Sequence, residues 1–90
     1  MTKITYGPGS IEVSGHAPQA VVCHGISAIC QMVANHVEKY NWGKVKRDEA
    51  YLLIYDVPEV YLYESLVIAM THGLEDIDAE YPGNIKFEYV

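Results

Sequence analysis

The sequence has few basic residues. Six Lys and Arg stand against twelve Asp and Glu, which gives a net charge of −6. Nucleic-acid binding needs clustered Lys and Arg to neutralise phosphates, and here only Lys44, Lys46 and Arg47 lie close together. We interpret these three as the solvated rim of a hairpin. The composition therefore argues against direct nucleic-acid binding and is compatible with a basic protein partner, whose approach an acidic surface favours.

Long apolar runs are also lacking. No segment approaches the roughly 18–20 consecutive apolar residues that a membrane-spanning helix requires. The first ten residues, MTKITYGPGS, contain no apolar signal-peptide segment. We therefore expect a cytoplasmic protein that has no membrane partner.

Cysteine is scarce, because Cys23 and Cys30 are the only two. On one helix, a separation of seven residues puts them about 10 Å apart, which is too far for a disulfide. No Cys-x-x-Cys or His-x-x-x-His pair occurs, and Cys23, His24 and His16 would supply at most three zinc ligands. We expect free thiols in a reducing compartment, with no metal and no cofactor.

The chain fits one domain, residues 1–90, and has no repeat, linker or low-complexity segment. Alternating polar and apolar residues predict strands, and apolar residues at steps of three and four predict helices. The strands are expected over residues 3–6, 10–14, 44–47, 50–56 and 85–89, and the helices over residues 20–40 and 58–80. The order β-β-α-β-β-α-β indicates an α+β fold, with a mainly antiparallel sheet and both helices packed on one face.

The small size of the domain favours self-association. A chain of 90 residues buries a modest fraction of its surface, and eight of its residues are tyrosines, which are common at interfaces. The chain has more large aromatic side chains than a compact core of this size needs to bury, among them Trp42, Tyr61 and Tyr63. We therefore expect a homodimer.

The stretch GHAPQAVVCHGIS, residues 15–27, combines a strand end, a short loop and the start of the long helix. Cys23 falls in the first turn of that helix, where free N–H groups and a partial positive charge stabilise a thiolate. The same amides are suited to binding the oxyanion of a tetrahedral intermediate. His16 ends the preceding strand and can approach Cys23 across Ala17–Gln19. The spacing thus permits a nucleophile and a general base.

Other roles are open for these residues. Cysteine often serves as a small buried hydrophobe, and His24 is an alternative base, although its ring projects from the helix beside Cys23. Ser27 lies one turn beyond Cys23 on the same helix face and is suited to orienting the pair or the substrate. It could instead bond to a carbonyl one turn earlier. Cys30 is interpreted as a packing residue.

Gly15-His16-Ala17, Val22-Cys23 and Ser27 resemble the signature of the Prp family of ribosomal-processing cysteine proteases. The likeness continues through the strand Tyr51–Tyr55 to the C-terminal pattern, which comprises Gly73-Leu74, Tyr81-Pro82 and Ile85-Lys86-Phe87.

The resemblance implies a catalytic dyad of His16 and Cys23, supported by Gly15 and Ser27. It implies a cytoplasmic homodimeric endopeptidase that removes an N-terminal extension from a large-subunit ribosomal protein, or from a structural protein in phage members. The chain departs from the family pattern in a short loop, Ala17–Val22, and in Ala20, which stands where the family has aspartate. The alternative is a catalytically inactive homodimeric binding module with the same fold.

Overall fold

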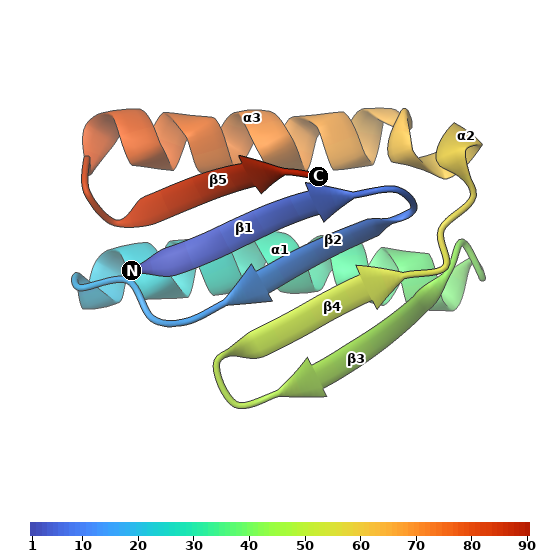
Figure 1. The fold of residues 1–90 in the computed structure, drawn as a ribbon, viewed down its shortest axis with the longest axis horizontal. Coiled ribbons are helices and arrows are strands. Elements are labelled where there is room, and N and C mark those ends of the chain that lie inside the picture. Colours follow the sequence, from blue (N-terminus) through green and yellow to red (C-terminus); the bar gives the residue numbers. More distant parts are fainter.

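The computed structural model describes residues 1–90 and contains one five-stranded sheet with helices on one side (Figure 1). The strands occur in the order β3-β4-β2-β1-β5, and only the β1–β5 pair is parallel. The bounds of the elements are β1 Thr2–Gly7, β2 Ser10–Ser14, α1 Ala20–Lys39, β3 Lys44–Asp48, β4 Tyr51–Tyr55, α2 Glu59–Leu62, α3 Ser65–Glu80 and β5 Ile85–Tyr89. The α+β class and the mainly antiparallel sheet are therefore confirmed.

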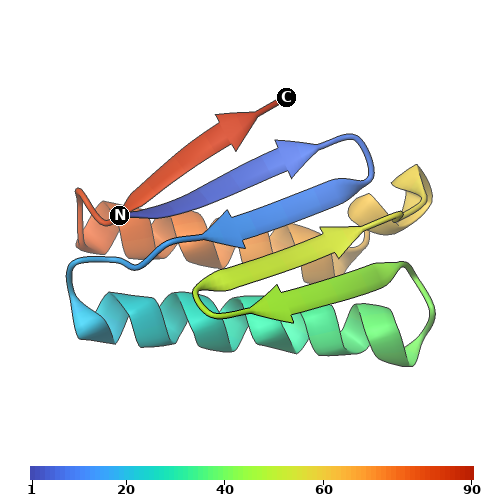
Figure 2. The same ribbon diagram turned by 60° about the horizontal axis from the view of Figure 1, so that its bottom comes forward.

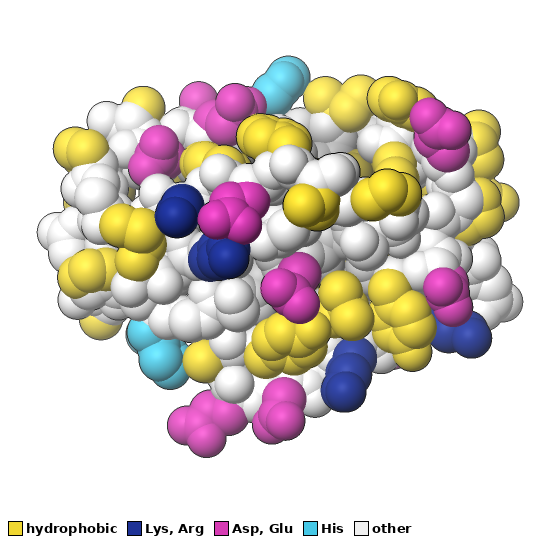
Figure 3. Space-filling view, viewed as in Figure 1, with side chains coloured by type: hydrophobic (Ala, Val, Ile, Leu, Met, Phe, Trp, Pro, Cys, Tyr) yellow, Lys and Arg dark blue, Asp and Glu magenta, His cyan; other side chains and the backbone are white.

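Both long helices, α1 and α3, cover the same face of the sheet, as Figure 2 shows. Alternation along the strands explains this arrangement, because every second residue points to the same side. In β4, Leu52 and Ile54 are buried beneath the helices, whereas the intervening side chains are only partly covered. Figure 3 shows hydrophobic side chains over β4 on this open face of the sheet. The predicted packing of two helices on one face is confirmed.

The second helical segment differs from the prediction in one respect. A single helix was expected over residues 58–80, but the chain forms the short α2, turns at Tyr63 and Glu64, and begins again as α3. Glu64 has an extended backbone, with φ −65° and ψ 146°. Tyr61 of α2 stacks on Trp42, with ring centroids 5.0 Å apart. This long-range contact holds α2 against the loop that follows α1, and local periodicity contains no sign of it.

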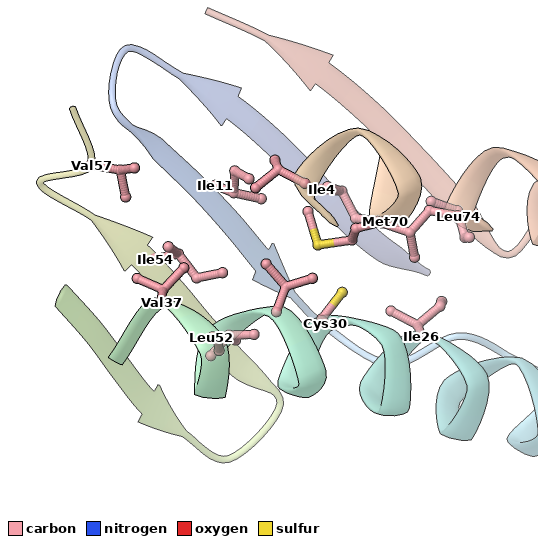
Figure 4. Packing of buried hydrophobic residues seen from close by; sticks show 14 of the residues in the cluster. Ile4, Ile11, Ile26, Cys30, Val37, Leu52, Ile54, Val57, Met70 and Leu74 are labelled. Carbon is pink, nitrogen blue, oxygen red and sulfur yellow. The ribbon is translucent and has the colours of Figure 1, made fainter. Parts of the chain in front are cut away.

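The core lies between the sheet and the two long helices (Figure 4). Helix α1 is long and apolar enough, by length and composition alone, to cross a membrane. Here it packs as a core helix, and its buried residues are Val22, Ile26, Cys30, Val33, Ala34 and Val37. The thiol of Cys30 points into this core and is 1 % exposed, so its interpretation as a packing residue agrees with its position.

Burial of Cys30 makes the stability of the protein depend on pH in the alkaline range. Burial raises the pKa of its thiol to about 12, from an ordinary value of 9.0. Between these values the unfolded chain loses a proton that the folded chain retains, so the free energy of unfolding falls by up to about 1.4 kcal/mol per pH unit as pH rises. We expect denaturant titrations to show that the free energy of unfolding of the wild type falls, relative to that of Cys30→Ala, as pH rises from 9.0 toward about 12. A pH-independent difference between the two proteins would contradict the prediction.

Candidate active site

The loop between β2 and α1 carries the candidate site, and Gly15 fixes its departure from the sheet. Gly15 has φ +84°, and a Cβ placed on it would lie 2.6 Å from the carbonyl oxygen of Met1. Only glycine fits this conformation and this close approach. Its N–H donates to the carbonyl of Ala50 at 2.9 Å, so the loop leaves the sheet at a defined position.

Asn84 anchors the other end of the loop. Its buried side-chain amide donates from Nδ2 to Oε1 of Gln19 at 2.8 Å and to the carbonyl of Tyr81 at 2.9 Å. Its Oδ1 accepts the backbone N–H of Gln19 at 3.2 Å. The carbonyl of Asn84 accepts the N–H of Thr2 at 3.0 Å. Gln19 directly precedes α1, so Asn84 positions the start of that helix.

The Cys23 sulfur points back over this loop. Side chains in an α-helix tilt toward its N-terminus, and Cys23 lies in the first turns of α1. Its Sγ accepts the N–H of Ala17 at 3.0 Å and lies 3.5 Å from the carbonyl oxygen of the same residue. An N–H group aimed at sulfur stabilises the negative charge of a thiolate.

Among the four histidines, only His16 lies beside this sulfur. Its Nδ1 is 4.0 Å from Cys23 Sγ, and its ring is exposed. His24, the alternative base, is exposed and lies outside the pocket around Cys23. His36 packs against Tyr40 and Trp42, and His72 lies on α3. The structure therefore brings His16 and Cys23 together.

A small pocket of about 220 Å³ surrounds the pair. Ser27 lines it as expected, but its hydroxyl makes no hydrogen bond to either His16 or Cys23. Gly15 also lines it. The opposite wall comes from the β3–β4 hairpin and includes Asp48, Ala50 and Tyr51.

Sequence reasoning missed this hairpin wall. Asp48 supplies the pocket's only carboxylate, and its Oδ1 accepts the N–H of Glu49 at 2.7 Å. Asp48 forms no ion pair with His16. Tyr51 donates its hydroxyl to Glu12 at 2.8 Å, and this bond raises the pKa of Tyr51. The turn signal at residues 48–49 predicts a hairpin, but nothing local predicts which loop the hairpin faces.

The site contains no arrangement suited to a metal ion. No group of three or more His, Cys, Asp or Glu side chains is gathered anywhere in the structure. Cys23, His16 and His24, the three ligands considered from the sequence, therefore do not form a set that could hold a metal ion.

Chemically, the arrangement joins a thiol to a neighbouring imidazole at a helix N-terminus. The N–H groups of Val22 and Cys23 both donate to the carbonyl of Gln19 at 3.1 Å. The first-turn amides without a backbone acceptor are therefore those of Ala20 and Val21. Thiolate, imidazole and free amides are the parts that acyl transfer requires.

The family model of the cysteine protease Prp matches residues 2–86. The chain belongs to this family. Two solved structures of the ribosomal processing protease Prp from Staphylococcus aureus superpose on the whole chain, and each is covered over its full length. One contains a covalently linked product peptide (TM-score 0.81, 21 % identity), and the other contains a substrate peptide (TM-score 0.80, 19 % identity).

A third structure, SMU.848 from Streptococcus mutans, has a TM-score of 0.69 and 18 % identity, with 99 % of this chain and 91 % of that chain covered. No curated protein sequence matches significantly. At these identities the structural likeness shows the Prp fold, and the family match confirms the resemblance found in the sequence.

The role of Asn84 can be tested by substitution. Asn84→Ala removes three hydrogen bonds of a buried side chain, two to Gln19 and one to the carbonyl of Tyr81, so we expect it to lower the free energy of unfolding by about 2 kcal/mol. Asn35→Ala is the matched control, because Asn35 is exposed and bonds only to Arg47, and we expect a change below about 0.5 kcal/mol. Denaturant titration measures both. Equal stability of Asn84→Ala and wild type would refute the anchoring role.

Proposed function

We propose that this protein is a cysteine endopeptidase that removes an N-terminal extension from another protein, with Cys23 as nucleophile and His16 as general base. The proposal rests on the groups that surround the sulfur atom of Cys23. Cys23 Sγ lies 3.0 Å from the N–H of Ala17 and 4.0 Å from Nδ1 of His16. Membership of a cysteine protease family supports the same chemistry.

The reaction follows from these positions. His16 takes the proton from the Cys23 thiol, and the thiolate attacks the carbonyl carbon of the scissile peptide bond. The tetrahedral oxyanion is bound by free amides of the first turn of α1. Its collapse breaks the C–N bond, and His16 returns the proton to the leaving amine. Water, deprotonated by His16, then hydrolyses the thioester and regenerates Cys23.

The distance between the two side chains is suited to a site that closes on its substrate. Catalytic hydrogen bonds are often long before substrate binds, and the exposed ring of His16 has room to move toward the sulfur. Neither Ser27 nor a backbone carbonyl bonds to the ring in this structure, and we propose that one of them takes the place of the family's aspartate once the ring has moved toward the sulfur. Gly15 supports the dyad by fixing the path of the chain into His16.

The proposed substrate is a basic protein, either a large-subunit ribosomal protein or a phage structural protein. The net charge of −6 favours a basic partner, and the related protease from S. aureus has been solved with a substrate peptide. We also propose a cytoplasmic homodimer. Of the aromatic residues that suggested self-association, Trp42 and Tyr61 stack on each other within the chain, whereas Tyr63 remains 70 % exposed.

Cleavage assays test the dyad directly. Incubation with basic proteins that carry N-terminal extensions, followed by mass spectrometry, is expected to show one trimmed product. Cys23→Ala should lower the rate by about 10⁴-fold or more, and His16→Ala by about 10²-fold or more. Cys30→Ala is the matched control and should retain activity, because Cys30 lies in the core. Full activity of Cys23→Ala would disprove the nucleophile assignment.

The second candidate function is a binding module that keeps the fold without turnover. The observation that favours it is the short loop, whose end is held by Asn84. Alkylation by iodoacetamide near neutral pH distinguishes the two candidates. A protease should be modified rapidly at Cys23 alone, since burial keeps Cys30 protonated. Slow modification of Cys23, at the rate of a small free thiol, would favour the binding module.

A further inference from the structure

A second and larger cavity, of about 690 Å³, lies at the opposite end of the sheet from Cys23. It is bounded by the β1–β2 turn, by α2 and α3, and by the ends of β1 and β5 (Figure 1). Strand β1 connects the two places, since Thr2 lines the candidate active site and Gly7 lines this cavity. The length of that strand separates them by about 17 Å.

The cavity has an aromatic floor. The rings of Tyr6 and Tyr89 stack with centroids 5.3 Å apart and an interplanar angle of 12°. The hydroxyls of Tyr6 and Thr71 share a hydrogen bond of 2.9 Å. Tyr63 lines the same cavity, and Tyr63 and Tyr89 are 70 % and 69 % exposed. Figure 3 shows hydrophobic side chains gathered at this corner of the molecule. Aromatic surface is therefore available to a ligand.

The rim of the cavity is acidic. Glu59 and Glu75 line it, no Lys or Arg does, and neither carboxylate takes part in an ion pair. Burial raises the pKa of Tyr6, and the nearby Glu75 carboxylate raises it further. His72 is the only lining side chain that can become cationic. The two helices beside the cavity have the same sign, because residues 59–80 contain six Asp and Glu and no Lys or Arg.

We infer that this cavity binds a basic segment of the protein substrate, at a distance from the bond that is cleaved. Arg and Lys combine a long apolar stem, which packs on Tyr6 and Tyr89, with a cation that pairs with Glu59 and Glu75. A second copy of this chain, with its net charge of −6, complements the acidic rim less well than a basic segment does. The inference rests on the proposed protease function and names a second point of contact with its substrate.

The geometry sets a spacing rule for such a substrate. Extended chain spans at most about 3.3–3.6 Å per residue, so a basic side chain in the cavity must lie at least about five residues from the scissile bond. A short peptide that contains only the cleavage site cannot reach the cavity. The same peptide continued by a basic segment can occupy both sites at once, which raises its effective affinity.

Comparison of these two peptides tests the inference. In Glu59→Gln/Glu75→Gln, we expect kcat/KM for the extended peptide to fall roughly fivefold to tenfold, because two exposed charge pairs are lost. Hydrolysis of the short peptide should be unchanged. Asp76→Asn/Glu80→Gln is the matched control, since it removes the same charge from exposed positions of α3 outside the cavity. An equal fall in the control, or no fall in the cavity variant, would overturn the inference.

A binding measurement separates this inference from the proposed catalysis. In Cys23→Ala protein, a short fluorescein-labelled polyarginine peptide should bind with a Kd that rises at least about fivefold when Glu59 and Glu75 become Gln. This result supports binding of a basic segment in the cavity even if no peptide is cleaved. Equal affinity in both proteins overturns it, whether or not the short peptide is hydrolysed. Loss of a wild-type dimer in Glu59→Gln/Glu75→Gln, seen by sedimentation, would show that a second copy occupies the cavity and would also overturn it.

Discussion

The buried amide of Asn84 is the interaction on which the candidate site depends. It joins the residue before α1 to the segment that follows α3, and its backbone carbonyl ties both to the start of β1. Its polar atoms have partners within the protein, so burial of this amide is not penalised. Because Gln19 is held at this point, the first turn of α1 has one position. Cys23 and the N–H of Ala17 then meet as a consequence of the fold.

A second constraint acts from the other end of the same loop. Gly15 leaves β2 with a positive φ and packs against the backbone of Met1, where a side chain would not fit. The loop is thus held at both ends by groups that do no chemistry. This support matters for the proposed dyad, because no carboxylate bonds to the ring of His16.

The two ends of the sheet differ in a way that suits a protein substrate. One end has a small pocket around a thiol, and the other has a larger aromatic cavity with an acidic rim. The rigid strand β1 sets the distance between them. The basic-segment site that we propose would select a substrate by the spacing of its charges and would leave the proposed reaction at Cys23 unaltered, so selectivity and turnover would vary separately.

Local patterns in the sequence were sufficient for most of the fold. Alternation in β2 and β5, the three-and-four spacing in α1, and the turn at Gly7-Pro8-Gly9 depend on neighbours in the chain, and their predicted elements are present. The break between α2 and α3 was missed because it depends on Tyr61 stacking on Trp42, a contact between distant segments. Periodicity contains no information about such contacts.

The same distinction applies to the candidate site. The sequence by itself determined that His16 and Cys23 lie on one short strand-to-helix connection, because a few residues of chain can join them in only a small number of ways. The tertiary structure alone decided that Asn84, distant in sequence, anchors this connection and that Asp48 and Tyr51 form its facing wall. Those contacts arise from the strand order and from helix packing. Burial of the whole core determines both, and so determines which distant segments become neighbours.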